Sequence, residues 1–189
     1  MKIRNLLISM LLLAVSLPIY SQTTTRTLKL QGIEMVETMS DDGTSMIKRP
    51  YRWFAGIGEA DVESLAVEMA QEEAYACISR VIENVVNAEA ERAALSVNGH
   101  VEKALKSYWK QVSNSVMKAC EPFGDTESVY DKETKMYQVT AKVGIRGDKY
   151  VKLIGAASDA KPENLGLEGG ELKQFIDANN AIIDAAKGN

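Results

Sequence analysis

Apolar residues recur at steps of three and four along residues 61–95, which is the period of an amphipathic α-helix. Glutamates lie off this stripe and small residues lie on it, so we expect its apolar face to pack closely against another element. Asp61 is an acceptable N-cap, and Asn98-Gly99 is a typical C-terminal stop. The stripe consists of Leu65, Ala66, Met69, Ala70, Ala74, Cys77, Ile78, Val81, Ile82 and Val85.

Two later segments have the same period. Residues 101–120 place Leu105 and Trp109 on one apolar face, and Pro122 marks the end of this helix. Together with residues 61–95, this segment predicts a helical hairpin. A third helix is predicted over residues 171–187.

The predicted C-terminal helix has an apolar stripe with two interpretations. The preferred one is that the stripe packs on its own domain, because burial of such a face supplies most of the stability of a helix. In the alternative, residues 158–170 form a Gly-rich linker, and the helix docks in a groove of a partner protein. The candidate contact residues are Leu172, Phe175, Ile176 and Ile183.

Strands are predicted where β-prone residues alternate with polar ones. Residues 136–145 alternate in this way and follow a polar turn, so they predict a β-hairpin with residues 127–130. Residues 51–57 are aromatic and β-prone. Asp42-Gly43 is a strong turn signal, which predicts an arm or a hairpin within residues 22–50.

These elements predict an α/β fold of the α+β kind. We expect a two-layer module in which a long helical hairpin covers a small antiparallel sheet, with an added C-terminal amphipathic helix. The predicted organisation is a signal peptide (1–21), an arm or hairpin (22–50), the α/β core (51–157), a linker (158–170) and the C-terminal helix (171–189).

The first 21 residues have the three-part plan of a secretory signal. Lys2 and Arg4 precede an apolar run from Leu6 to Ile19, and the small residue Ser21 precedes the expected cleavage point. The run of about 14 residues is shorter than the roughly 20 that a membrane-spanning helix needs. We therefore expect cleavage and no transmembrane helix afterwards, with an uncleaved signal as the alternative.

The residue after the expected cleavage point is Gln22, and the only cysteines are Cys77 and Cys120. A bacterial lipoprotein needs a cysteine at that point, so we expect no N-terminal lipid anchor. The predicted location is the periplasm or the cell exterior, with the periphery of the outer membrane as a further option. The sequence does not indicate an oligomeric state.

The formal net charge is −4, and removal of the signal takes away Lys2 and Arg4. An acidic chain is poorly suited to nucleic acids or anionic membranes, which are bound chiefly by neutralising their negative charge. His100 is the only histidine and has no second histidine or thiol pair at metal-binding spacing, so we expect neither a metal site nor a cofactor. Gly56 and Gly58 suggest a phosphate-binding loop, but Asp61 stands where a third glycine belongs, so we interpret them as backbone permissiveness.

Cys77 and Cys120 lie at similar distances on either side of the predicted turn between the two helices. An antiparallel hairpin with a rise of about 1.5 Å per residue places both thiols at one height. Export exposes the chain to an oxidising compartment, yet helix axes about 8–10 Å apart often hold cysteines beyond bonding reach. The sequence leaves two alternatives, a disulfide and two buried free thiols, and in either of them the cysteines have a structural role.

Tyr51, Trp53 and Phe54 form an aromatic cluster with two interpretations. Burial of an aromatic side chain contributes about 2–3 kcal/mol, which explains the cluster as one edge of a core. An aromatic surface that contacts a partner protein is the alternative.

The segment Arg49–Ala60 (RPYRWFAGIGEA), followed by alanines at four-residue spacing (Ala66, Ala70 and Ala74), resembles the LPP-twenty family of small envelope lipoproteins. The related N-terminal domain of the flagellar assembly protein T is similar too. The resemblance covers Tyr51–Gly147 and implies a compact α/β module with a later β-hairpin and no catalytic residues. It also implies a non-enzymatic envelope component that acts through protein contacts, although the lipid-bearing cysteine of many members is missing here.

We therefore expect an exported, non-enzymatic protein with a structural or protein-binding role in the cell envelope. The expected partners are other envelope proteins. The alternative is a hydrolase or small-ligand enzyme whose acids converge from separate elements, for instance Glu59 and Glu127.

Overall fold

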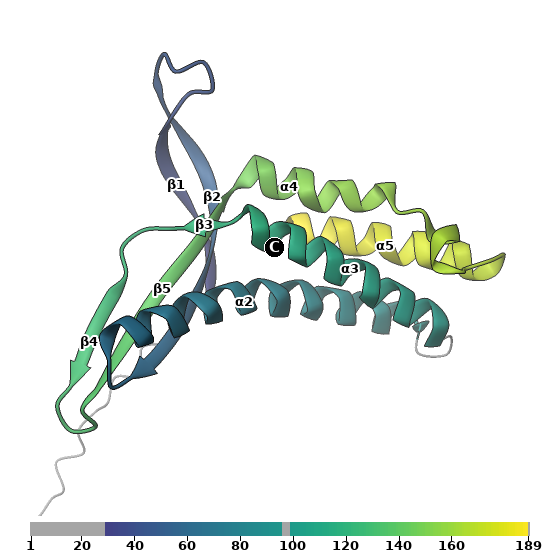
Figure 1. Ribbon diagram of the computed structural model, residues 1–189. Coiled ribbons are helices and arrows are strands. Elements are labelled where there is room, and N and C mark those ends of the chain that lie inside the picture. The colour runs from purple at the N-terminus through teal and green to yellow at the C-terminus, as the bar shows by residue number, and fades with distance from the viewer. Residues whose placement is uncertain (1–28, 96–98, 189) are drawn as a thin grey trace, which may run out of the picture.

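The computed structural model describes residues 29–95 and 99–188, so the predicted signal peptide lies outside the described residues. The described part has an α+β fold, with a five-stranded antiparallel sheet and a group of packed α-helices (Figure 1). The predicted fold class is confirmed.

The sheet is built around two long strands. β2 (Met46–Ala60) and β5 (Met136–Arg146) pair antiparallel at its centre, and β1 (Gln31–Met39) forms one edge beside β2. On the far side of β5, β3 (Glu121–Pro122) and β4 (Glu127–Asp131) pair with different parts of that strand. The hairpin predicted within residues 127–145 is present as β4 and β5.

The β1–β2 hairpin has its turn at the Asp-Gly signal, where Gly43 has a φ of 72°. β2 continues from this hairpin into the centre of the sheet, so the boundary predicted between residues 50 and 51 lies inside a single strand. Pairing with β5 begins at Tyr51, and Pro50 lies just beyond it. The missing N–H of Pro50 therefore removes no bond between β2 and β5.

Helix α2 (Glu63–Arg92) packs on the sheet at very short range. A Cβ added to Gly56 would lie 2.2 Å from the carbonyl oxygen of Ala70, and one added to Gly58 would lie 2.0 Å from that of Ala66. Ala66 and Ala70 are themselves fully buried. The predicted close-packing face is confirmed. Gly56 and Gly58 provide the space that α2 occupies, and this replaces backbone permissiveness, which the sequence suggests, as the reason for the two glycines.

The N-cap of α2 is Val62, without a side-chain capping bond, so the prediction of Asp61 as the cap is wrong. Asp61 precedes the cap by one residue, because β2 runs on to Ala60 and leaves only a two-residue connection to the helix.

The other helices lie beside the sheet. Helices α3 (Gly99–Ala119), α4 (Gly147–Gly155) and α5 (Gly170–Gly188) pack together, and α3 and α5 also pack against the C-terminal part of α2 (Figure 1). The helical hairpin α2–α3 is therefore present; within it α2 packs on β2 and β5, and α4 also contacts these two strands. At about 1.5 Å per residue, α2 is longer than the strands that it covers. Its C-terminal part extends beyond the sheet and packs against other helices.

The segment predicted as a linker packs against the helices. It contains two short 3₁₀ turns, Ala156–Asp159 and Pro162–Leu165, and Leu167 is only 2% exposed within the main core. This segment therefore holds α5 in place and does not act as a free tether.

A buried polar cluster joins the helices. The indole Nε1 of Trp109 in α3 donates a hydrogen bond of 2.9 Å to Oδ1 of Asn179 in α5. The amide nitrogen of Asn179 in turn donates to the carbonyl oxygen of Ala157 at 2.8 Å. Both polar side chains are satisfied, so their burial fixes the position of α5 at little cost.

Candidate functional site

The β1–β2 hairpin carries the main cluster of exposed apolar side chains in the described part of the chain. β2 extends beyond the end of its pairing with β5, so the hairpin projects from the rest of the sheet (Figure 1). Ile33, Met35, Met39 and Met46 lie on one face of the hairpin and are 57–66% exposed, with the Glu37–Lys48 pair between Met35 and Met39. We call these four residues the hairpin strip.

β1 also forms an edge of the sheet. Its outer backbone groups have no strand partner among the described residues, and two acids, Glu34 and Glu37, lie on this strand. Lys48 of β2 lies 3.8 Å from Glu37. Charged side chains on an edge strand disfavour uncontrolled pairing, while the unpaired backbone still offers a template for a suitable partner strand.

An aromatic cluster lies on the sheet face that is turned away from α2. The rings of Tyr51 and Phe123 stack at 5.6 Å, and Nζ of Lys142 lies 4.9 Å from the ring centroid of Trp53. A Cβ on Gly32 would meet the ring of Trp53, and one on Gly144 would meet the ring of Phe123. The glycines therefore let these half-buried rings lie flat on the strands.

Comparison of the chain with protein-family models, with curated proteins and with solved structures gives no match. Membership of the LPP-twenty family stays a prediction.

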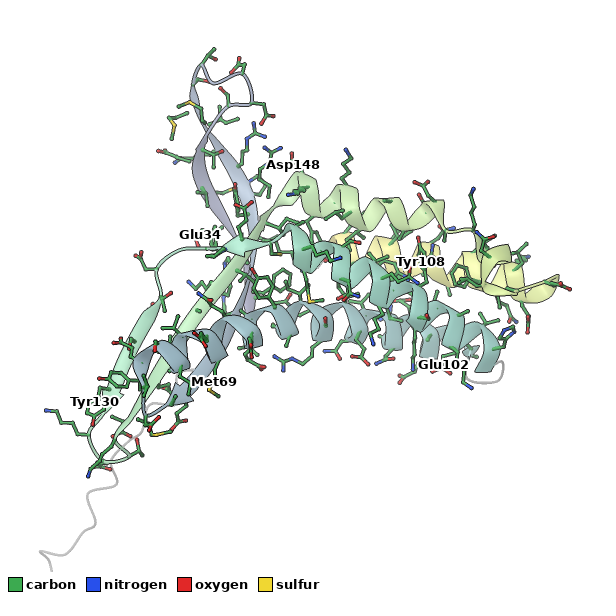
Figure 2. All side chains as sticks on the ribbon, viewed as in Figure 1. Glu34, Met69, Glu102, Tyr108, Tyr130 and Asp148 are labelled. Atoms are coloured by element: carbon green, nitrogen blue, oxygen red, sulfur yellow. The ribbon has the colours of Figure 1, made fainter. Side chains whose placement is uncertain are left out.

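An ion-pair network fastens the tip of the hairpin to the body. Asp41 of the turn lies 2.9 Å from Arg49 and 3.0 Å from Arg146, and Arg146 also pairs with Asp148 at the start of α4. Figure 2 shows Asp148 close to the point where the hairpin leaves the body. The hairpin is therefore held in one orientation relative to α4.

This network shifts the titration of its carboxylates. Hydrogen bonds from Arg146 lower the pKa of Asp148 to about 2, and those from Arg49 and Arg146 lower the pKa of Asp41. Ser40 and Thr44 donate to Asp42 and lower its pKa to about 2, which stabilises the turn itself. The folded state thus favours the ionised form of all three acids.

We expect the attachment of the hairpin tip to weaken in acid. A carboxylate with a lowered pKa stabilises the folded state fully above its unfolded value of 3.8. That contribution is lost as the pH falls through the folded value of about 2. Titration of the side-chain carboxyl carbons by NMR should give a midpoint near 2 for Asp148, moving toward 3.8 in Arg146→Gln. A midpoint near 4 in the unmodified protein would contradict the ion-pair geometry.

The structure places the predicted contact residues in different environments. Tyr51 and Trp53 are half-buried in the aromatic cluster, whereas Phe54 faces α2 and is fully buried. Phe54 cannot contact a partner in the folded protein, because neighbouring residues of a strand point to opposite faces.

In α5, Phe175 and Ile183 are buried in the main core, Leu172 is half-buried, and Ile176 is 43% exposed. The stripe therefore packs on its own domain, as the preferred interpretation has it, and Phe175 and Ile183 are wrong as contact residues. The cause is that α5 lies against α2, α3 and α4.

Cys77 and Cys120 are buried free thiols. The thiol of Cys77 donates to the carbonyl oxygen of Leu30 at 3.4 Å, so it is directed toward the segment before β1. Burial raises the pKa of Cys120 to about 12 and also raises the pKa of Cys77. The candidate disulfide is not formed, and neither thiol has the lowered pKa of a reactive cysteine.

The residues considered for chemistry do not assemble a catalytic group. Nδ1 of His100 lies 3.2 Å from Glu171 in an exposed pair, and the described residues include no cluster of three or more His, Cys, Asp or Glu suited to a metal ion. Glu59 and Glu127 lie on the outer face of the sheet with β5 between their strands and a register offset of two residues, which places their Cα atoms about 12 Å apart. Among the described helices, none is long and apolar enough to cross a membrane.

Sequence reasoning missed two grooves between helices. The larger, of about 450 Å³, lies between α2 and α3 over Ile82, Val86 and Trp109, with Lys106 and Lys110 on its rim. The second, of about 340 Å³, lies between α2 and α5 and includes Arg92. The floor of the larger groove consists of side chains that are already buried, so it offers little free apolar surface.

Proposed function

We propose that this protein is an exported, non-enzymatic component of the cell envelope that binds another envelope protein through its β1–β2 hairpin. The observation that carries this proposal is the hairpin strip, four large apolar side chains at 57–66% exposure on one face of a projecting hairpin. Exposed apolar side chains gathered on one face are typical of protein interaction sites, and here the Glu37–Lys48 pair lies among them. The secretory pattern of residues 1–21 and the resemblance to the LPP-twenty family support the envelope location.

The hairpin suits a binding role for a second reason. Its tip is tied to α4 through Asp41, Arg146 and Asp148, so the strip is held in place before a partner arrives. A preorganised surface loses less conformational entropy on binding than a flexible one. Methionine contributes three of the four side chains, and its flexible thioether adapts well to a partner surface.

The partner is expected to contact both the strip and the free edge of β1. An extended segment that adds to an exposed strand gains main-chain hydrogen bonds from the edge and side-chain contacts from alternate residues. The alternative role as a hydrolase has no observation in its favour, because Glu59 and Glu127 lie on a flat strand face and line neither groove.

Replacement of Met35 and Met39 by aspartate tests the proposal. Both side chains are exposed, so the variant should keep its thermal midpoint, while the new charges should oppose an apolar contact. Chemical crosslinking in intact envelopes, followed by mass spectrometry, should recover a defined partner with the unmodified protein. Recovery should fall by about tenfold or more in the variant, which corresponds to at least about 1.4 kcal/mol.

The matched control is Val129→Asp. Val129 is 64% exposed on β4, which lies at the edge of the sheet opposite β1. This variant therefore adds the same kind of charge at an equally exposed strand position. Unchanged recovery in the control and loss in the hairpin variant would support the proposal. Equal recovery in all three proteins would place the contact elsewhere, and the absence of any specific partner would contradict the binding role.

A further inference from the structure

Arg52 has an unusual position for a charged side chain. It is 6% exposed and lies on the helix-facing side of β2, in the corner where the sheet meets α4. Its guanidinium carbon lies 4.6 Å from the ring centroid of Tyr150 and 5.9 Å from that of Phe54. Both rings lie within about 6 Å of the guanidinium carbon, where an aromatic ring stabilises a cation without supplying a carboxylate to its N–H groups.

Every other arginine in the described part of the chain has a carboxylate partner. Arg49 and Arg146 pair with aspartates, and Arg80 and Arg92 pair with glutamates. Arg52 is the most buried of the five and is the one without an ion pair among the described residues. A buried charge normally requires a partner, because the loss of hydration costs several kcal/mol.

The hydrogen bonds of Arg52 are incomplete along one edge. Nε is buried and has no hydrogen-bond partner in the described structure. Nη2 makes a single long bond of 3.5 Å to Oε1 of Gln31. Nε and Nη2 together form one side of the planar guanidinium group, and this side binds the two oxygens of a carboxylate in parallel.

We propose that this edge of Arg52 is a binding site for the carboxylate group of a ligand, in the corner formed by β1, β2 and α4. The amide oxygen of Gln31 lies at the limit of hydrogen-bond distance from Nη2, so a carboxylate oxygen can replace it with a stronger, charge-assisted bond. One isolated positive charge matches a single negative charge, which favours a carboxylate over a phosphate dianion. The neighbouring side chain on the same face, Ile33, is exposed and gives the ligand an apolar contact.

Two sources can supply this chemistry, a small free acid and the C-terminal carboxylate of a peptide. The site adjoins the hairpin strip at Ile33, but the residues that define it, Arg52, Gln31 and Tyr150, lie outside the strip. It therefore remains testable on the isolated protein.

The first test measures thermal unfolding of the whole protein in sodium acetate and in sodium chloride at equal ionic strength. Acetate should raise the unfolding midpoint of the unmodified protein in a saturable manner, because a ligand of the folded state stabilises it by mass action. Arg52→Lys keeps the charge and loses the planar edge, so the acetate-dependent shift should disappear. The control Arg80→Lys, at an exposed site, should keep the full shift.

A second measurement does not rely on the folding of a variant. The Nε–H resonance of Arg52 in the NMR spectrum of the unmodified protein should move on addition of acetate and reach a plateau. If a peptide with a free C-terminus shifts this resonance at lower concentration than acetate does, and the C-terminal amide of the same peptide does not, the ligand is the C-terminus of a peptide. If acetate shifts the resonance at the same concentration as the peptide, the ligand is a small acid. No movement of the resonance, or an equal acetate shift in Arg52→Lys, would overturn the proposal.

Discussion

Replacement of Phe175 by alanine is expected to lower the free energy of unfolding by about 3–5 kcal/mol. Phe175 is completely buried in the main core, where its ring meets that of Tyr108 edge to face at 6.1 Å. Alanine removes these contacts and leaves a cavity among α3, α5 and the residues around them. Urea unfolding followed by circular dichroism should show a lower transition midpoint with little change in slope.

The control for this prediction is the neighbouring residue. Ile176→Ala changes a side chain that is 43% exposed, and its cost should stay within about 1 kcal/mol. If both variants unfold at the same urea concentration as the unmodified protein, α5 is not part of the cooperative core, and α5 is again a candidate docking element.

Replacement of Gly58 by alanine is expected to lower the free energy of unfolding by about 2–3 kcal/mol, although only one methyl group is added. The new Cβ would lie 2.0 Å from the carbonyl oxygen of Ala66 and 2.5 Å from the amide nitrogen of Ala70. Both atoms belong to the backbone of α2, so no side-chain rotation can relieve the contact. The first part of α2 must move away from the sheet, and this movement loses packing around Val139 and Ala141.

Gly170→Ala serves as the matched control for Gly58→Ala. A Cβ at Gly170 meets no atom within 4 Å, so the free energy of unfolding of this variant should lie within about 0.5 kcal/mol of that of the unmodified protein. The same chemical unfolding experiment measures both variants. Equal stability of Gly58→Ala and Gly170→Ala would mean that α2 does not approach β2 as closely as the structure has it.

The secondary structure was largely predictable from the sequence, because its signals are local. The stripe of Ala66, Ala70 and Ala74 gave the helix and its close-packing face, and Asp42-Gly43 gave the turn of the first hairpin. Both patterns depend on residues within a few positions of one another.

The arrangement of the elements and most of the candidate site were not predictable, because they depend on long-range pairing. The isolation of Arg52 becomes visible only when Tyr150 and Gln31 are placed around it. Adjacency in the sequence groups Phe54 with Trp53, yet the pleat of β2 directs their side chains to opposite faces of the sheet. The exposure of the hairpin strip is not predictable, because the alternation in this segment is imperfect and no sequence signal marks a projecting strand.

The pairing of β2 with β5 has a consequence for the order of folding. Tyr51 pairs with Arg146, so the two central strands come from distant parts of the chain, whereas β1–β2 and β4–β5 are local hairpins. Local hairpins form within about 1–10 μs, while long-range pairing must first overcome the entropy of closing a large loop. The β1–β2 hairpin can therefore exist before the centre of the sheet is assembled, and we expect the joining of β2 to β5 to be the slow step of folding.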